Sequence, residues 1–196
     1  MKKSVLKRMS IIDIPAAENL NGVNIFVDTN VLIFVDGAHS FDEKEKAYSN
    51  AYFKLIKNNN MFTSEKCLGE FYNRLAKLYF RLDQENDPSI VDFKKYRKSA
   101  EFSTSMQCIY DATRDFISDL NVIKSYEHVD IDKAFDSART GLIDYADIIS
   151  ARICLKEDMY FFSDDGDSIY CKDLKIISNN KWMLSKVEKR HSLACL

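Results

Sequence analysis

The stretch Asn24-Ile-Phe-Val-Asp-Thr-Asn-Val-Leu-Ile-Phe-Val35 decides the fold of this chain. Residues 25–27 are an apolar run of strand formers, which suits a strand buried on both faces. Asp28 ends this run, and apolar residues resume at Val31. A carboxylate at the carboxyl end of a buried parallel strand opens into the crevice where α/β sheets bind ligands. The alternative is that Asp28 only caps the following helix, because Asp, Thr and Asn are all good N-caps.

Length and composition predict one domain with a core of its own. The chain has 196 residues, of which 46% are apolar, and only 5 glycines and 2 prolines, so long helices are expected. The formal net charge of −2 neither indicates nor excludes nucleic-acid binding. Five cysteines without a CxxC pair indicate reduced thiols in a cytoplasmic protein rather than a disulfide framework or a zinc site. No apolar run approaches the roughly 18 residues that span a bilayer, so we expect no membrane contact and no signal peptide.

Apolar patterning predicts strands that alternate with helices. The expected strands cover residues 25–27, 61–63, 121–126, 160–162 and 174–177. The expected helices cover residues 43–58, 66–82, 90–118 (as one or two helices), 130–138, 144–158 and 181–190. This alternation predicts an α/β three-layer sandwich with a central, mostly parallel five-stranded sheet flanked by helices. Residues 1–196 would form a single domain, with 1–22 as an irregular or briefly helical leader and 84–118 as a helical addition.

One further acidic residue, Asp147, lies near the start of the helix expected at 144–158. That helix is apolar almost all round, and a buried carboxylate without a partner costs several kcal/mol. Two partners are open: an ion pair with Arg152 or another basic residue, or a metal ion that Asp147 shares with Asp28.

More acids follow the strand at 160–162, in Ser163-Asp164-Asp165-Gly166-Asp167. Asp and Gly favour turns, but a turn alone does not account for three acids in four positions after a buried strand. Glu70, in the helix at 66–82, would by itself be an ordinary solvated charge. All these side chains offer oxygen, which suits Mg²⁺ or Mn²⁺ rather than Zn²⁺.

Together these motifs resemble the PIN-domain nucleases, and among them the VapC-like ribonucleases. The matching segments are Asp28-Thr29-Asn30, Ser64 with Glu70-Phe71-Tyr72, Asp147-Ile148-Ile149-Ser150-Ala151 and Ser163-Asp164-Asp165-Gly166-Asp167. They cover roughly residues 24–190 in the expected order. Ser163 stands where Thr is more usual, and Ser168 stands where Phe is common, which we expect to loosen the loop. Residues 113–116 resemble the last motif too, but their helical context argues against them.

The resemblance implies a metal-dependent endoribonuclease that uses Mg²⁺ or Mn²⁺. The implied catalytic residues are Asp28, Glu70, Asp147 and Asp165, and the implied metal ligands are these four and Asp167. Asn30 and Ser163 would orient the ligands or a water, and Asp144 would be auxiliary. The implied partners are an RNA substrate, a small antitoxin of a type II toxin–antitoxin pair, and a second copy of the chain as a homodimer.

The helix at 66–82 carries a second signal. Its apolar residues recur on one face, at Leu68, Tyr72, Leu75, Tyr79 and Leu82. Its other face carries Glu70 and then the basic residues Arg74, Lys77 and Arg81. This basic stripe either holds an RNA backbone or is a plain solvated face.

Three other functions fit parts of the pattern. One is a PIN-like module that binds RNA or protein without catalysis, and another is a structure-specific DNA nuclease. The third is a phosphatase in which Asp28 is phosphorylated, but such enzymes use an Asp two residues later as general acid, and this chain has Asn30 there.

Overall fold

A computed structural model describes residues 10–37 and 42–186 of the chain. Its centre is a sheet in which every pair of neighbouring strands is parallel. The strands are β1 (Ser10–Ile12), β2 (Asn24–Val27), β3 (Asn60–Ser64), β4 (Asn121–Ile123), β5 (Tyr160–Phe162) and β6 (Lys175–Ile177), in the spatial order β1-β6-β5-β2-β3-β4. The α/β class and the parallel sheet are therefore confirmed.

The prediction of five strands was wrong by one, because the supposed leader contributes β1. Its Ser10 N–H donates to the carbonyl of Leu174, and the carbonyl of Ile12 accepts from Ser178 N–H, which joins β1 to the edge of the sheet beside β6. Only three residues long, β1 lacks the apolar run that identifies a strand in a sequence. The short helix α1 (Ile14–Ala17) follows, with Asp13 as its N-cap. Residues 1–9 of the predicted leader lie outside the described part of the chain.

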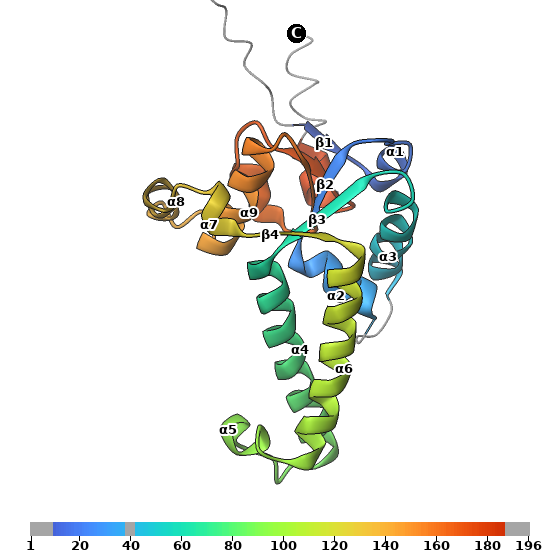
Figure 1. Ribbon diagram of the computed structural model, residues 1–196, viewed down its shortest axis with the longest axis vertical. Coiled ribbons are helices and arrows are strands. Elements are labelled where there is room, and N and C mark those ends of the chain that lie inside the picture. Colours follow the sequence, from blue (N-terminus) through green and yellow to red (C-terminus); the bar gives the residue numbers. More distant parts are fainter. Residues whose placement is uncertain (1–9, 38–41, 187–196) are drawn as a thin grey trace, which may run out of the picture.

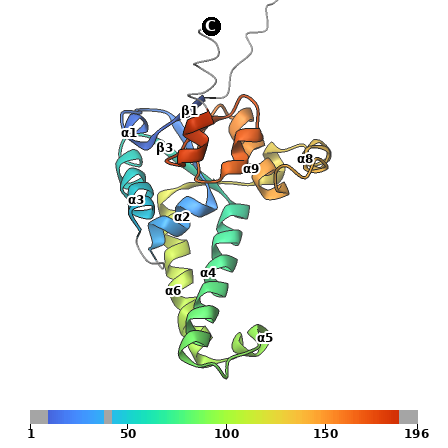
Figure 2. The ribbon, with the colours of Figure 1, turned by 180° about the vertical axis from the view of Figure 1, so that it is seen from behind.

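Helices connect and cover the strands. They are α2 (Thr29–Asp36), α3 (Glu43–Leu55), α4 (Glu65–Asn86), α5 (Phe93–Tyr96), α6 (Ala100–Asp119), α7 (Ser125–His128), α8 (Ile131–Ala138), α9 (Tyr145–Lys156) and the 3₁₀-helix η1 (Gly166–Tyr170). Figures 1 and 2 show α1 and α3 on one side of the sheet and α9 on the other. Residues 181–186 are helical, while 187–190 of the helix predicted there lie outside the described residues.

The central strand β2 is as buried as its sequence predicts. Ile25, Phe26 and Val27 are fully inaccessible, since β2 pairs with β3 on one side and β5 on the other. The carboxyl ends of β2, β3 and β5 therefore lie side by side, and this edge of the sheet carries the acidic motifs.

The helices α4 and α6 extend away from the sheet as an arm, with α5 at its far end (Figure 1). Near the sheet, the rings of Phe71 and Phe116 meet edge to face at 5.2 Å between centroids. At the tip, four aromatic rings pack together, those of Phe80, Phe93, Tyr96 and Phe102. Aromatic packing thus gives the helical addition at 84–118 a small core of its own.

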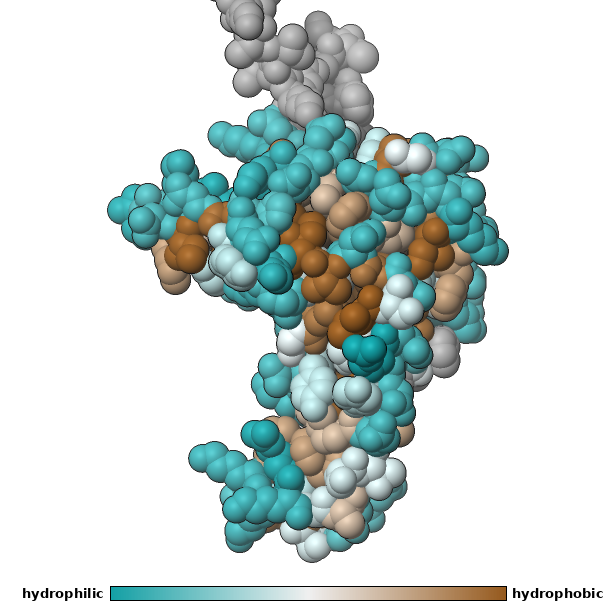
Figure 3. Space-filling model, viewed as in Figure 1, coloured by the Kyte–Doolittle hydropathy of each residue, from teal (hydrophilic) through white to brown (hydrophobic). Residues whose placement is uncertain are grey.

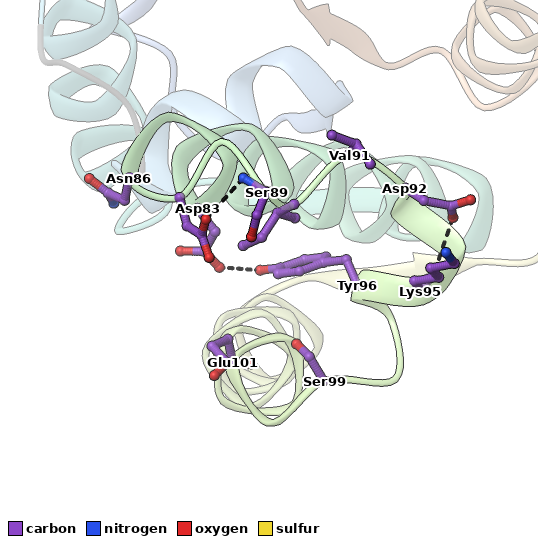
Figure 4. A pocket seen from close by; sticks show the side chains of 11 residues that line it. Asp83, Asn86, Ser89, Val91, Asp92, Lys95, Tyr96, Ser99 and Glu101 are labelled. Atoms are coloured by element: carbon purple, nitrogen blue, oxygen red, sulfur yellow. Dashed lines mark hydrogen bonds between the residues drawn. The ribbon is translucent and has the colours of Figure 1, made fainter.

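The arm tip also holds a cavity of about 500 Å³, which we call the tip cavity (Figure 4). Among its lining residues are the acids Asp83, Asp87, Asp92 and Glu101. The hydroxyl of Tyr96 points at Asp83 and donates a hydrogen bond to its carboxylate.

The surface is polar over most of the face drawn in Figure 3, with apolar surface gathered where the sheet meets the arm. Val122 of the edge strand β4 and Ile117 at the end of α6 are 39% and 40% exposed. None of the helices in the described part of the chain combines the length and apolar character needed to cross a bilayer.

Candidate functional site

Asp28 lies at the carboxyl end of β2 and is also the N-cap of α2. Its Oδ1 accepts from Thr29 N–H at 2.8 Å, and its Oδ2 accepts from Asn30 Nδ2 at 2.7 Å and from Ser163 Oγ at 2.6 Å. Asp28 is buried, with only 5% of its surface exposed, and these three hydrogen bonds hold its carboxylate in place. Asp28 is therefore a helix cap as well as a buried carboxylate that faces the crevice.

Ser163 and Asn30 tie the loop after β5 to the loop after β2. Asn30 donates from Nδ2 to Ser163 Oγ at 3.2 Å and accepts at Oδ1 from Asp164 N–H at 3.1 Å. Ser163 Oγ also accepts from Asp165 N–H at 3.0 Å. The hydroxyl that Ser retains in place of Thr thus contacts both Asp28 and the backbone of Asp165.

The loop after β5 separates its three acids into different environments. Asp164 turns toward α3, where it accepts from Lys44 Nζ and from the Tyr48 hydroxyl, both at 2.8 Å. Asp165 caps η1 by accepting from Asp167 N–H, and Asp167 itself is exposed.

Ser168 does not loosen this loop, contrary to the expectation from the sequence. Its side chain is buried, and its hydroxyl donates to the carbonyl of Asp165 at 2.7 Å. A small polar residue at this position therefore fastens the loop that carries Asp165.

Four carboxylates lie within electrostatic reach of one another at this edge of the sheet. Burial raises the pKa of Asp28 from 3.8 to about 6, and the charges of Asp165 and Glu70 add to the effect, opposed by the hydrogen bonds from Ser163 and Thr29. Burial and, after it, the charges of Asp28, Asp165 and Glu70 together raise the pKa of Asp147 from 3.8 to about 8. Asp144, the N-cap of α9, is a smaller contributor.

Arg152 is not the partner of Asp147. Its Nη2 donates to the carbonyl of Lys133 and to Ser137 Oγ, both at 2.8 Å, so it fastens α8 to α9. Among the described residues Asp147 makes no ion pair, and its charge therefore lacks the compensation that an arginine would supply.

Glu70 is held differently from the other three acids. Its Oε2 accepts from Thr29 Oγ1 at 3.2 Å, and its Oε1 lies 3.5 Å from Arg74 Nη1. Since the Glu70 side chain is 44% exposed, this ion pair is screened by water and binds the carboxylate only weakly.

A cavity of about 480 Å³ opens over these acids, and we call it the acid cavity. Among its lining residues are Asp28, Glu70, Asp147, Arg74 and Lys77. Arg81, the last residue of the predicted basic stripe, does not line it. Of the three residues of the predicted basic stripe, Arg74 and Lys77 therefore lie at the acids and Arg81 lies farther along α4.

Lys66 and Asn73 also line the acid cavity and were not predicted from the sequence as site residues. Lys66 Nζ also lies 4.4 Å from the centroid of the Tyr145 ring. On α4, Lys66 lies four residues before Glu70 and Asn73 three residues after it, so both share its helix face. Helical spacing from Glu70 could therefore have identified them.

The acids fit a divalent cation by their chemistry, although their side chains are not already arranged around one. Among residues 10–37 and 42–186, no group of three or more His, Cys, Asp or Glu side chains stands in a metal-holding arrangement. All the donors are carboxylate oxygens, which hard cations such as Mg²⁺ and Mn²⁺ prefer. The raised pKa values of Asp28 and Asp147 show that negative charge here is costly without a cation.

Comparison with known proteins finds relatives through structure alone. No protein-family model matches the chain, and no curated protein matches its sequence. The structure of VapBC2 from Rickettsia felis, bound to a DNA fragment from its promoter, aligns over 80% of this chain and 98% of that one, with a TM-score of 0.51 and 17% identity. FitAcB from Neisseria gonorrhoeae aligns over 78% and 96%, with a TM-score of 0.51 and 13% identity. The predicted resemblance to the VapC-like PIN domains is thus confirmed at the level of the fold, and this chain has a PIN-like fold.

Proposed function

We propose that this protein is a metal-dependent endoribonuclease that hydrolyses RNA phosphodiester bonds and serves as the toxin of a type II toxin–antitoxin pair. The observation that carries the proposal is the crowding of four acids: Asp28, Glu70 and Asp147 line one cavity together with Arg74 and Lys77, and the charge of Asp165 reaches Asp28 and Asp147 from the neighbouring cavity. A module that only binds RNA or protein has no need of this crowding, because mutual repulsion lowers the stability of the fold.

The four acids would hold one or two Mg²⁺ or Mn²⁺ ions, with Asp167 close by in the same loop. Bound there, the metal would lower the pKa of a water and neutralise charge on the phosphate under attack. Ser163 and Asn30 hold Asp28 and the Asp165 backbone in position, so they would set the geometry of the ligands without touching the substrate.

Cations on α4 would bind the substrate backbone. The acid cavity is also lined by Arg74, Lys77 and Lys66. Their positive charges would attract a phosphate of the substrate and offset its repulsion by the acids. Arg81 lies farther along the same helix and would reach a phosphate only beyond the cavity.

The proposed partners follow from the structural neighbours. VapBC2 and FitAcB share this fold, which supports a small antitoxin as partner for this chain. The homodimer is proposed from the family resemblance alone. We place the protein in the cytoplasm, where its RNA substrate would be found. Purification together with the product of an adjacent small gene, followed by measurement of the complex mass, tests both partners.

The activity is tested by incubating the full chain with single-stranded RNA in Mn²⁺, in Mg²⁺ and in EDTA. We expect cleavage with either metal, none in EDTA, and none with Asp28→Asn. Single-stranded DNA of the same sequence serves as the second substrate. Cleavage of RNA that persists in EDTA would contradict the metal-dependent mechanism, and cleavage of DNA alone would assign the protein to the DNA nucleases.

A further inference from the structure

Three cavities of this structure lie in a row beside the acids, and each neighbouring pair shares a lining residue. The acid cavity shares Arg74 with a smaller cavity of about 300 Å³, which is also lined by Asn30 and Asp165. This smaller cavity shares Asp164 with a third cavity of about 490 Å³. A strand bound at the acids can therefore follow the surface past Arg74 and Asp164 into the third cavity.

The third cavity is built around Trp182, the only tryptophan of the chain. Its indole is 45% exposed, and it lies beside the loop that carries Asp165, since a Cβ built on Gly166 would be 3.5 Å from the ring. Asn180 fixes this arrangement: its Oδ1 accepts from Trp182 N–H at 3.1 Å, and its Nδ2 donates to the carbonyl of Asp164 at 2.9 Å.

The remaining lining of the third cavity is polar and partly cationic. Lys181 and Lys44 both line it, and the charge of Lys44 is shared with Asp164 through an ion pair of 2.8 Å. Asn179 contributes a side-chain amide that makes no hydrogen bond to the described residues, while its backbone N–H donates to the Tyr48 hydroxyl. The cavity thus offers a flat aromatic ring, an amide that the described residues leave without a hydrogen bond, and the cation of Lys181, while its two acids, Asp164 and Glu43, pair with Lys44 and Lys46.

We propose that this cavity, the Trp182 subsite, binds one unpaired nucleotide of the RNA strand next to the phosphate that is cleaved. The base would stack on the indole, the Asn179 amide would meet polar atoms of the base edge, and Lys181 would contact a phosphate. The proposal deepens the ribonuclease function and rests on it. It makes the substrate a single strand, because a paired base cannot stack on a side chain.

Two observations favour a nucleotide over a protein segment as the occupant. The subsite shares Asp164 with the smaller cavity, which shares Arg74 with the acid cavity, where the proposed function already places a phosphodiester. Apart from its single aromatic ring the subsite is lined by amides, lysines and two ion-paired acids, whereas the core of a protein-docking surface is richer in apolar contacts. Lys186 Nζ lies 5.3 Å from the indole centroid, and a stacked base would displace this exposed contact.

The sole tryptophan makes the subsite directly observable. Intrinsic fluorescence of the full chain would be titrated with a short single-stranded RNA in EDTA, so that no cleavage occurs, while the anisotropy of the same labelled RNA reports total binding. We expect binding to quench the fluorescence of Trp182. We expect Trp182→Ala to weaken binding by about 10-fold, the loss of one base–aromatic stack, and Trp182→Phe to retain most of the affinity.

A matched control is Tyr110→Ala, which removes a ring of similar exposure (53%) from α6 and should leave binding unchanged. If RNA binds without quenching the fluorescence of Trp182, and Trp182→Ala leaves the affinity unchanged, the nucleotide subsite is wrong. The cavity would then remain available to a protein partner, and the ribonuclease function would stand. If the wild type neither binds nor cleaves RNA, the proposed function fails and the subsite fails with it. Melting curves of both Trp182 variants establish that they are folded.

Discussion

The tip cavity and the acid cavity are similar in size and both are lined by acids, but the pKa values of their carboxylates are shifted in opposite directions. In the tip cavity, hydrogen bonds from Ser89 lower the pKa of Asp87, and bonds from the backbone and Ser99 lower the pKa of Glu101. In the acid cavity, burial and neighbouring charges raise the pKa of Asp28 and Asp147. The tip acids are satisfied by the protein, whereas the acids at the sheet edge gain from a cation that the protein does not supply.

This difference teaches that acidic composition alone does not identify a metal site. Asp92 illustrates it at the tip, where the carboxylate caps α5 by accepting from the N–H groups of Lys94 and Lys95. Asp28 also caps a helix, yet its capping bonds do not offset the cost of burial. The distinguishing observation is whether the carboxylate is stabilised or destabilised in its charged form.

The largest expected effect is the difference in cleavage rate between two variants, each lacking one acid of one of the two cavities. Asp147→Asn should lower metal-dependent RNA cleavage by at least about 1000-fold, because one ligand of the proposed metal and its charge are lost. Asp87→Asn should leave the rate within about 2-fold, since its carboxylate only accepts turn hydrogen bonds. Initial rates at saturating Mn²⁺ measure both, and equal losses in the two variants would remove the distinction.

A smaller effect on cleavage is expected at Ser163, whose hydroxyl positions Asp28 and Asp165. Ser163→Ala removes the hydroxyl that donates to Asp28 and accepts from Asp165 N–H, so activity should fall by about 10- to 100-fold. Ser163→Thr keeps the hydroxyl and should stay near wild type. Rates as a function of Mn²⁺ concentration separate weaker metal binding from damaged folding, and a Thr variant as poor as Ala would refute the positioning role.

The basic residues extend the comparison to binding. Arg74→Ala with Lys77→Ala should weaken single-stranded RNA binding by about 10-fold and reduce the slope of log affinity against log salt by about 1.4, or about 0.7 for each phosphate contact. The control is Lys94→Ala with Lys95→Ala on α5, where the slope should not change. An unaltered slope in the first pair would make α4 a plain solvated face.

The sequence predicted the acidic edge better than it predicted the sheet that carries it. Asp28, Asp147 and Asp165 were recognisable because each one follows an apolar strand or begins an apolar helix, whereas Glu70 was identified only through the family resemblance. The structure brings all four acids within electrostatic reach. The strand β1 was missed because three residues carry no period, and its identity depends on pairing with β6, which is 165 residues away in register at Ser10 and Lys175.

Helix faces were predicted only in part. On α4 the apolar stripe included Tyr72, yet Tyr72 is 38% exposed and Phe71 is fully buried. Phe71 packs on Phe116, so the position of α6 decides which side of α4 is inside, and no local pattern contains that information. The pairing of Asp164 with Lys44 and the joining of three cavities at Arg74 and Asp164 are likewise properties of the assembled fold.

The smallest expected effect is a shift in stability with pH, and it depends directly on the crowding of the acids. The folded state holds protons on Asp28 and Asp147 up to about pH 6 and about pH 8, whereas the unfolded state loses them near pH 3.8. The stability contributed by these groups is thus complete below pH 3.8 and is lost as the pH rises to about 8. Asp147→Asn, which has no proton to lose, should gain melting temperature relative to wild type as the pH rises from 5 to 9.

The most direct test of the account is therefore a set of melting curves in EDTA and in Mn²⁺ at pH 8, for wild type and Asp147→Asn. At about 100 times the dissociation constant, Mn²⁺ should stabilise the wild type by about 2.7 kcal/mol, or roughly 5–10 °C for a chain of this size. Asp147→Asn should melt above wild type in EDTA and gain less from the metal. A variant that melts below wild type in EDTA and gains as much from Mn²⁺ would contradict the claim that these acids are crowded around a cation site.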